Sequence, residues 1–259
     1  MSIQDPNVLI DCRGLQVGYD GVAMLPPIEV DVHRGVFCVV VGRNGSGKST
    51  WFKTVLGLIP PVSGQVMHAP GLKVAYIPQR LHYDPIYPLT AINVVRMGAL
   101  NGFNFWGSSG LDYDELKLAM DAVDVWKLRD QSFRSLSEGQ KQRVLFARAL
   151  VSRPEVAFMD EPTSAMDVVA EREMLSLVDR VRRDRKMAVV MVTHELSVAA
   201  EYAEQVIFVD RTSRTVLAGT PREVLGHEQF ARLYGQEKAH ELLVELDHFQ
   251  RRKAGGPHT

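Results

Sequence analysis

Residues 37–50 read FCVVVGRNGSGKST and join five consecutive apolar residues to a loop with three glycines. A short run that is apolar at every position is typical of a parallel strand with both faces covered. The residues that follow the loop, 49–58, are predicted to form a helix. A strand, a glycine-rich loop and a helix in this order favour an α/β fold with a mainly parallel sheet.

The loop at 42–50, GRNGSGKST, matches the pattern G-x-x-x-x-G-K-[ST] of a P-loop. Glycines let such a backbone wrap around phosphates with its N–H groups pointing inward. We expect Lys48 to reach the β- and γ-phosphates of a nucleotide and the Ser49 hydroxyl to ligate Mg²⁺. The residues predicted to bind the nucleotide here are Gly42, Asn44, Gly45, Ser46, Gly47, Lys48, Ser49 and Thr50.

Short apolar runs on both sides of the loop extend the alternation of strands and helices. We predict strands at 8–19, 28–32, Val74–Ile77, 156–159, 188–192 and 205–209. A helix is expected over 172–185, because Leu175, Val178 and Val181 fall on one helical face. Residues 89–150 are expected to be mostly helical, since helical patterns there are separated by a polar, glycine-rich loop.

These elements predict a single domain over residues 1–250 with a P-loop NTPase core. Its first part is expected to be an antiparallel β subdomain, with strands on either side of a turn at Tyr19-Asp20-Gly21. A helical subdomain at about 89–150 is predicted as an insertion. Residues 251–259, RRKAGGPHT, are expected to form a disordered tail.

The composition excludes several classes of function. A net charge of −1 gives no general attraction to nucleic acid or anionic lipid. The N-terminus lacks the pattern of a signal peptide, and no run approaches the roughly 18 apolar residues of a membrane-spanning helix. We therefore expect that the chain does not cross a membrane by itself. Cys12 and Cys38 lie in apolar, strand-like surroundings that fit neither a disulfide framework nor a metal site.

An acidic pair, Asp160 and Glu161, ends the strand predicted at 156–159. Asp160 is expected to hold Mg²⁺ through water, and Glu161 to polarise the attacking water as a general base. By itself, such a pair is as often a helix cap or a solvated turn. The hypothesis of catalysis depends on the P-loop in the same chain.

His194 follows the strand predicted at 188–192. At the carboxyl end of a strand in an open α/β sheet, it would lie on the ligand side. A histidine there can donate to an oxygen of the γ-phosphate. The alternative is a structural or merely exposed histidine. The other histidines His33, His68 and His82 are scattered, so Mg²⁺ is the only metal that we assign to the chain.

Six motifs, taken in order, resemble those of ATP-binding-cassette (ABC) ATPases. They are GRNGSGKST at 42–50, Gln79 in YIPQ, LSEGQ at 136–140, FMDEP at 158–162, Ser164-Ala165-Met166-Asp167, and His194. Over residues 8–235 the chain resembles the nucleotide-binding subunit of a bacterial ABC transporter. The resemblance implies that it binds ATP and Mg²⁺ and that it hydrolyses ATP to drive transport.

The resemblance also implies roles for single residues. Tyr19 would stack on adenine, although a tyrosine at a strand end can also pack on its own sheet. Gln79 would sense Mg²⁺ and water, the alternative being a solvated loop residue. Asp167 would cross a dimer interface. The implied catalytic residues are Lys48, Gln79, Glu161 and His194, and the implied magnesium ligands are Ser49, Gln79 and Asp160.

The LSEGQ motif is implied to serve the P-loop of a second copy. In the family two subunits bind head to tail, so that Ser137 and Gly139, with Gln140 beside them, meet the γ-phosphate held by Lys48 of the other copy. The implied partners are a second copy, integral membrane permease subunits and, indirectly, an extracytoplasmic substrate-binding protein. The implied location is peripheral, on the cytoplasmic face of the inner membrane.

Glu138 stands where the family more often has glycine, and it permits two hypotheses. Ser135 with Glu138, and Ser137 with Gln140, both have the spacing of a helix capping box. On this hypothesis Glu138 points away from the nucleotide and stabilises the start of the helix. The other hypothesis is that a carboxylate near the γ-phosphate weakens ATP binding between two subunits.

Residues 76–98 resemble the matching stretch of zinc- and manganese-type import cassettes, which implies a divalent metal ion as the transported substrate. Two departures are the missing Asp-Trp pairing in LHYDPIYP and Ser164-Ala165 where Gly-Val is common. Siderophore, heme and cobalamin import share much of this pattern and stay open. Residues 89–110, with Phe103, Phe105 and Trp106, are expected to face the permease, or to pack on their own loop.

Other classes of ABC protein are less compatible with the sequence. Members that act on DNA need a long coiled coil, but the spacing between Lys48 and Asp160 leaves room only for a helical subdomain. Members that act on ribosomes carry two cassettes in a chain, and one is present here. A cassette that drives export stays an alternative.

Overall fold

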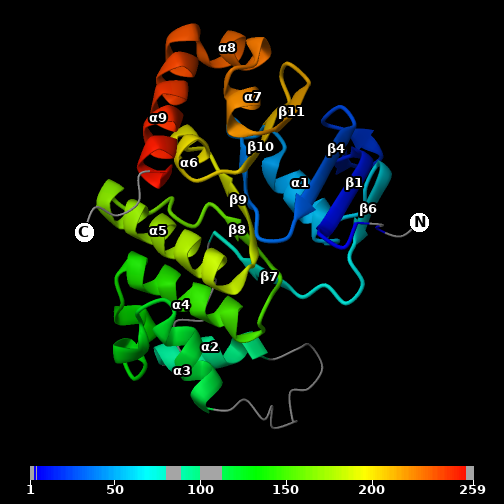
Figure 1. Ribbon diagram of the computed structural model, residues 1–259. Helices are drawn as coiled ribbons and strands as arrows, with labels where there is room; N and C mark the ends of the chain where they lie inside the picture. The colour runs from blue at the N-terminus through cyan, green and yellow to red at the C-terminus, as the bar shows by residue number, and fades with distance from the viewer. Residues whose placement is uncertain (1–2, 4, 80–88, 100–112, 255–259) are drawn as a thin grey trace. The chain divides into compact units, whose positions relative to one another are not determined.

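The computed structural model describes residues 3, 5–79, 89–99 and 113–254, and Figure 1 shows the path of the chain. The chain divides into two compact units. Unit 1 combines Met1–Pro70 with Val190–Thr259, and unit 2 is Gly71–Val189. The division differs from the helical insertion expected at 89–150, because unit 2 also takes in the strands and the long helix that flank those residues.

Unit 1 begins with an antiparallel sheet of order β4-β1-β6, formed by β1 (Val8–Gln16), β4 (Ile28–His33) and β6 (Ser63–His68). In β4 the apolar residues Ile28, Val30 and Val32 are buried and alternate with exposed acidic residues, as in a sheet with one covered face. The predicted N-terminal antiparallel subdomain is confirmed. β6 was not predicted, because its sequence SGQVMH lacks the alternation that marks such a strand.

A small hairpin follows β1 and interrupts the strand that we expected over 8–19. It pairs β2 (Gly18–Tyr19) with β3 (Val22–Ala23) in antiparallel register. Its turn residues Asp20 and Gly21 have φ of 51° and 76°, the left-handed backbone that a tight hairpin requires. The turn expected at this point is therefore present.

A second group of strands in unit 1 has the order β11-β10-β5-β9. These strands are β5 (Phe37–Val41), β9 (Ala188–Thr193), β10 (Gln205–Asp210) and β11 (Thr215–Gly219). β5 is buried at every position and runs parallel to β10, as its uninterrupted apolar sequence predicts. β9 carries the boundary between the units, since unit 1 starts again at Val190.

The helices of unit 1 are α1 (Lys48–Val55), α6 (Leu196–Glu201), α7 (Pro221–Leu225), α8 (Glu228–Tyr234) and α9 (Gln236–Ala254). α9 contacts α6, α7 and α8 and buries Ala239, Leu242 and Leu246. The disordered tail expected from residue 251 is wrong for 251–254, which belong to α9. Residues 255–259 lie outside the described ranges.

Unit 2 contains β7 (Val74–Ile77) and β8 (Val156–Asp160), which are parallel and follow the order β9-β8-β7. Its helices are α2 (Ala91–Arg96), α3 (Tyr113–Asp121), α4 (Glu138–Val151) and α5 (Val168–Arg185), with short 3₁₀ turns at Met97–Ala99, Trp126–Leu128 and Phe133–Ser135. α4 contacts α2, α3 and α5. The described part of 89–150 is thus helical.

Helix α5 begins four residues before the helix that we expected at 172–185. Asp167 precedes it, and its Oδ1 accepts hydrogen bonds from the N–H groups of Val169 at 3.0 Å and Ala170 at 2.9 Å. A side chain that caps a helix start in this way fixes where the helix begins. Among the helices that the structure describes, none combines the length and the apolar character needed to span a bilayer.

Candidate functional site

The glycine-rich loop of unit 1 connects β5 to α1. A Cβ atom on Gly42 would lie 2.1 Å from the carbonyl oxygen of Val209, so that only glycine fits there. Gly47 is the residue before α1 and has φ of 105°, a left-handed backbone that glycine adopts without strain. These two positions explain why the loop takes this sharp path into the helix.

Lys48 lies inside this loop with only 5% of its surface exposed. Its Nζ donates to the carbonyl oxygen of Gly42 at 2.7 Å and to that of Arg43 at 3.1 Å. The ammonium charge is therefore held against the loop backbone, beside the start of α1. The first turn of a helix carries N–H groups without acceptors in the helix and the positive end of the helix dipole. Both features favour an anion.

The donor groups of the loop fit phosphate and magnesium. The Oγ of Ser46 is buried and has no hydrogen-bond partner among the described residues. A buried hydroxyl without a partner costs free energy, and a ligand with oxygen acceptors would remove that cost. A Cβ on Gly45 would meet nothing within 4 Å, and Asn44 and Ser49 are exposed, so the loop is open on this side. The Ser49 hydroxyl is an oxygen donor of the hard kind that Mg²⁺ prefers.

Tyr19 and His194, the other residues predicted in unit 1, are both accessible. Tyr19 is 51% exposed and pairs across its hairpin with the exposed Val22. Its ring is thus open to stacking. His194 follows β9, and its Nε2 lies 3.3 Å from Oε1 of Glu195.

In unit 2, Asp160 and Glu161 lie at the carboxyl end of β8, and Asp160 is its last residue. The pKa of Tyr76 on β7 is raised, first by the burial of its own ring and then by the charge of Asp160. Glu161 has φ of 43°, a left-handed backbone that is uncommon for a residue other than glycine. Strained backbone of this kind concentrates at functional sites. The Oε2 of Glu161 accepts a hydrogen bond from Nε2 of Gln79 at 3.0 Å.

The LSEGQ motif lies at the start of α4. The Oγ of Ser137 accepts from the N–H of Gln140 at 3.3 Å, and Oε1 of Gln140 accepts from the N–H of Ser137 at 3.0 Å. This is a complete capping box. The capping box expected between Ser135 and Glu138 is wrong, because Ser135 instead donates to the carbonyl oxygen of Ser132 at 2.8 Å.

Glu138 occupies the first position of α4 and is 56% exposed. Its Oε1 lies 2.6 Å from Nζ of Lys141, one turn further along the helix. A carboxylate in the first turn interacts favourably with the helix dipole, so Glu138 stabilises the helix start by charge rather than by capping. The pairing with Lys141 was not predicted, although opposite charges three residues apart on a helix are a sufficient signal.

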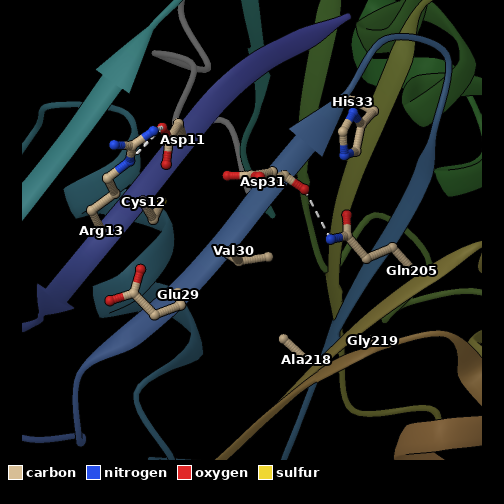
Figure 2. A pocket seen from close by; sticks show the side chains of 10 residues that line it. All are labelled: Asp11, Cys12, Arg13, Glu29, Val30, Asp31, His33, Gln205, Ala218 and Gly219. Atoms are coloured by element: carbon tan, nitrogen blue, oxygen red, sulfur yellow. Dashed lines mark hydrogen bonds and ion pairs between the residues drawn. The ribbon is translucent and has the colours of Figure 1, made fainter. Parts of the chain in front are cut away.

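Unit 1 also contains a cavity of about 410 Å³ that no motif indicates (Figure 2). Asp11 on β1 and Asp31 on β4 are direct cross-strand partners at its wall, and Arg13 lies 2.7 Å from Asp11. Burial, followed by the charge of Asp11, raises the pKa of Asp31. None of the residues predicted to bind the nucleotide lines this cavity.

The predicted site residues divide between the two units. Unit 1 holds the loop 42–50, Tyr19 and His194, whereas unit 2 holds Gln79, Asp160, Glu161 and the motif 136–140. Within unit 2 the structure brings Gln79 and Glu161 into direct contact across 82 positions of sequence. The aromatic residues Phe103, Phe105 and Trp106, expected to face a permease, lie outside the described residues.

The chain is similar in sequence to known proteins over most of its length. The sequence pattern described as "ABC transporter" matches residues 25–164. The zinc import ATP-binding protein ZnuC of Yersinia enterocolitica is 32% identical over 246 residues, which cover 95% of this chain and 93% of that protein. The chain belongs to the ABC transporter family. As an ABC ATPase subunit, it binds and hydrolyses ATP, and membership implies permease partners and the dimerisation that is general for such cassettes.

Other proteins are similar to this ABC cassette in sequence or in structure. The zinc import ATP-binding protein ZnuC of Pseudomonas fluorescens is 34% identical over 230 residues, covering 89% of this chain and 84% of that one. A metal-chelate type ABC transporter in an inward-facing conformation has a TM-score of 0.80 and 27% identity, covering 88% of this chain and 89% of that one. CbiO1 of Clostridium perfringens shares the fold. Its TM-score is 0.72, and it is 23% identical, covering 91% of this chain and 99% of that one.

Proposed function

We propose that this ABC ATPase powers the import of a divalent metal ion of the zinc or manganese type. The observation that carries the substrate class is the 32% identity to a zinc import ATP-binding protein over nearly the full length of both chains. The resemblance of residues 76–98 to the same kind of cassette supports it. A metal chelate is the second candidate, because the metal-chelate type transporter has a similar structure at 27% identity.

The P-loop residues are proposed to hold ATP. Lys48 would bind the phosphates with its ammonium group, since it already lies buried beside the start of α1. The buried hydroxyl of Ser46 would donate a hydrogen bond to a phosphate oxygen. Tyr19 would stack on the base with its exposed ring. Gly42, Asn44, Gly45, Gly47, Ser49 and Thr50 complete the proposed loop.

Magnesium is proposed to bind through Ser49, Asp160 and Gln79. Bound Mg²⁺ would neutralise the charge that develops on the phosphate oxygens. Glu161 would take a proton from the attacking water as general base, and His194 would donate a hydrogen bond to the γ-phosphate. The left-handed backbone and the hydrogen bond to Gln79 support this role for Glu161.

The LSEGQ motif is proposed to complete the ATP site of a second copy. Ser137, Gly139 and Gln140 at the start of α4 would meet the γ-phosphate there, and the open space around Gly139, where a Cβ would meet nothing within 4 Å, supports such access. The dimer would dock on permease subunits at the cytoplasmic face of the inner membrane. An extracytoplasmic substrate-binding protein would deliver the metal to the permease.

The decisive test of the site is the substitution Glu161→Gln. It keeps the size of the side chain and removes the base, so ATP should still bind and hold the dimer while turnover nearly disappears. Glu241→Gln on α9, where Oε2 lies 2.9 Å from Lys238, is the matched control and should turn over normally. Normal turnover by Glu161→Gln would contradict the proposed role.

The substrate class is tested by growth of a deletion strain. Cells that lack this chain should fail to grow when zinc or manganese is scarce, and added metal should restore growth. Normal growth of that strain when zinc and manganese are scarce, together with failure to use a siderophore, heme or cobalamin, would replace the proposal with import of that chelate.

A further inference from the structure

Several hydrogen bonds hold the turn between β8 and α5. The N–H of Ser164 donates to the carbonyl oxygen of Glu161 at 3.3 Å, and that of Met166 donates to the carbonyl oxygen of Thr163 at 3.0 Å. The buried Thr163 in turn donates its hydroxyl to Glu171 on α5 at 2.8 Å. Glu161 and Ser164 are therefore the first and fourth residues of a turn whose shape is set by its own hydrogen bonds.

Two side chains of this turn contact one amide group. Nε2 of Gln79 donates to Oε2 of Glu161 at 3.0 Å and to Oγ of Ser164 at 3.4 Å. The sheet explains why they meet, because Ile77 and Met159 are partners in the parallel pair of β7 and β8. Gln79 and Glu161 each lie two residues beyond these partners, at the same end of the two strands.

The two contacts define the orientation of the amide. An amide nitrogen carries two hydrogens, and an ionised carboxylate can only accept. Glu161 therefore selects the nitrogen rather than the oxygen of Gln79. The last torsion of a glutamine is broad, so a single contact leaves the amide free to rotate, whereas the second contact, to Ser164, limits that rotation.

We propose that Ser164 is a positioning residue for ATP hydrolysis. It holds the amide of Gln79 so that the amide directs Glu161, the general base. Fixing one oxygen of a carboxylate fixes the direction in which its other oxygen points. The inference rests on the proposed roles of Glu161 and Gln79, and it gives a role within the same chain to Ser164, the first residue of the motif at 164–167.

The substitution Ser164→Ala tests this inference in the purified full chain with saturating ATP and Mg²⁺. Loss of one neutral hydrogen bond should lower kcat by about two- to tenfold. KM for ATP should not change, because Ser164 acts through Gln79 and not on the nucleotide. Ser164→Thr keeps the hydroxyl and should restore kcat. Ser152→Ala, which removes a hydroxyl bonded to the carbonyl oxygen of Ala149 at 3.0 Å, is the matched control and should turn over normally.

A double substitution decides whether Ser164 acts through Gln79. In a Gln79→Ala chain, the further change Ser164→Ala should have no effect, because the amide that it positions is gone. An equal loss of kcat in both backgrounds would overturn the inference, as would a rise in KM together with the fall in kcat. If Ser164→Ala is silent while Glu161→Gln is inactive, this inference alone fails; turnover by Glu161→Gln contradicts the proposed function itself.

A second measurement does not depend on turnover. Hydrogen–deuterium exchange over Val74–Ile77 and Gln79 in the chain without nucleotide reports how firmly this end of β7 is held. Ser164→Ala should speed exchange there, and Ser164→Thr should return it to the level of the unmodified protein. Exchange that is the same in all three proteins would contradict a positioning role.

Discussion

Helices α1 and α4 both start at a Ser- and Gly-containing motif, yet their first turns are built differently. Gly47 precedes α1 and has no side chain to cap it, and Lys48 supplies a positive charge in the first turn. Ser137 precedes α4, caps the N–H of Gln140, and is followed by the carboxylate of Glu138. The start of α1 is open to an anion, whereas at the start of α4 one backbone N–H already has an acceptor within the chain and a carboxylate lies in the first turn.

This contrast predicts how the two proposed phosphate-binding helix starts divide their roles. A helix start with free N–H groups and a nearby cation can hold an anion by itself. A start that already has a cap and a carboxylate gains less from an anion. We therefore expect ATP to bind first at the P-loop, with the α4 motif adding its contacts only when a second copy approaches.

The largest expected effect separates Lys48 and Lys141, the lysines in the first turns of these two helices. Lys48→Ala removes the charge held in the P-loop, and turnover should fall by roughly 100-fold or more, with weaker binding of ATP. Lys141→Ala removes the lysine of α4 and should leave ATP binding to a single chain unchanged. Calorimetric titration with ATP and an ATPase assay measure both. Similar losses of ATP binding in both variants would abolish the distinction.

The next effect concerns stability after substitution of one glycine at each helix start, Gly47 before α1 and Gly139 in α4. At Gly47, φ of 105° and a Cβ position 3.0 Å from Leu25 predict that Gly47→Ala lowers the free energy of unfolding by about 1–3 kcal/mol. At Gly139 a Cβ meets nothing within 4 Å, so Gly139→Ala should leave stability unchanged or raise it by up to about 1 kcal/mol. Thermal denaturation of the two variants in parallel checks the contrast, and an equal loss in both would refute it.

Substitution of Ser137 separates its cap from its proposed contact with phosphate. Ser137→Ala should cost about 1 kcal/mol of stability through the lost cap. Ser137→Asn keeps a capping group and should restore the melting temperature, but not the ATPase activity, if the hydroxyl itself meets the phosphate. Recovery of both properties in Ser137→Asn would mean that the cap alone is required.

The smallest expected effect is that of Glu138. Because its carboxylate is exposed and neutralised by Lys141, Glu138→Gly should change the ATPase rate less than tenfold, which corresponds to about 1.4 kcal/mol. Lys141→Ala leaves the carboxylate uncompensated and should slow turnover more than Glu138→Gly does, and the double variant should recover. A change of tenfold or more in Glu138→Gly would favour the hypothesis that this carboxylate weakens the ATP-bound dimer.

Local patterns predicted most of the strands, but not β6 or β11. The bounds of β5 and β7 agree with the expectation, because each is a short run between clear loop residues. The start of α5 was missed because the apolar face begins at Leu175, whereas the Asp167 cap sets the first turn. α9 was not predicted, although the spacing of Ala239, Leu242 and Leu246 indicates a helix.

The contacts of the site were harder to predict than its residues. Glu161 was assigned from the acidic pair at a strand end and Gln79 from the resemblance to ABC ATPases, but no local pattern connects residues that are 82 positions apart. Their meeting depends on the register of β7 against β8, and register is a tertiary property. The contact of Ser164 depends in addition on a turn whose left-handed residue, a glutamate, gives no local signal.

The backbone of Glu161 has a consequence for the heat resistance of the protein. A glycine would adopt φ of 43° more readily than glutamate does, so Glu161→Gly should melt at a higher temperature while it loses catalysis. Selection for thermal stability alone would then act against the proposed general base. On this expectation, Glu161 holds the melting temperature below the value that a glycine at the same position would give.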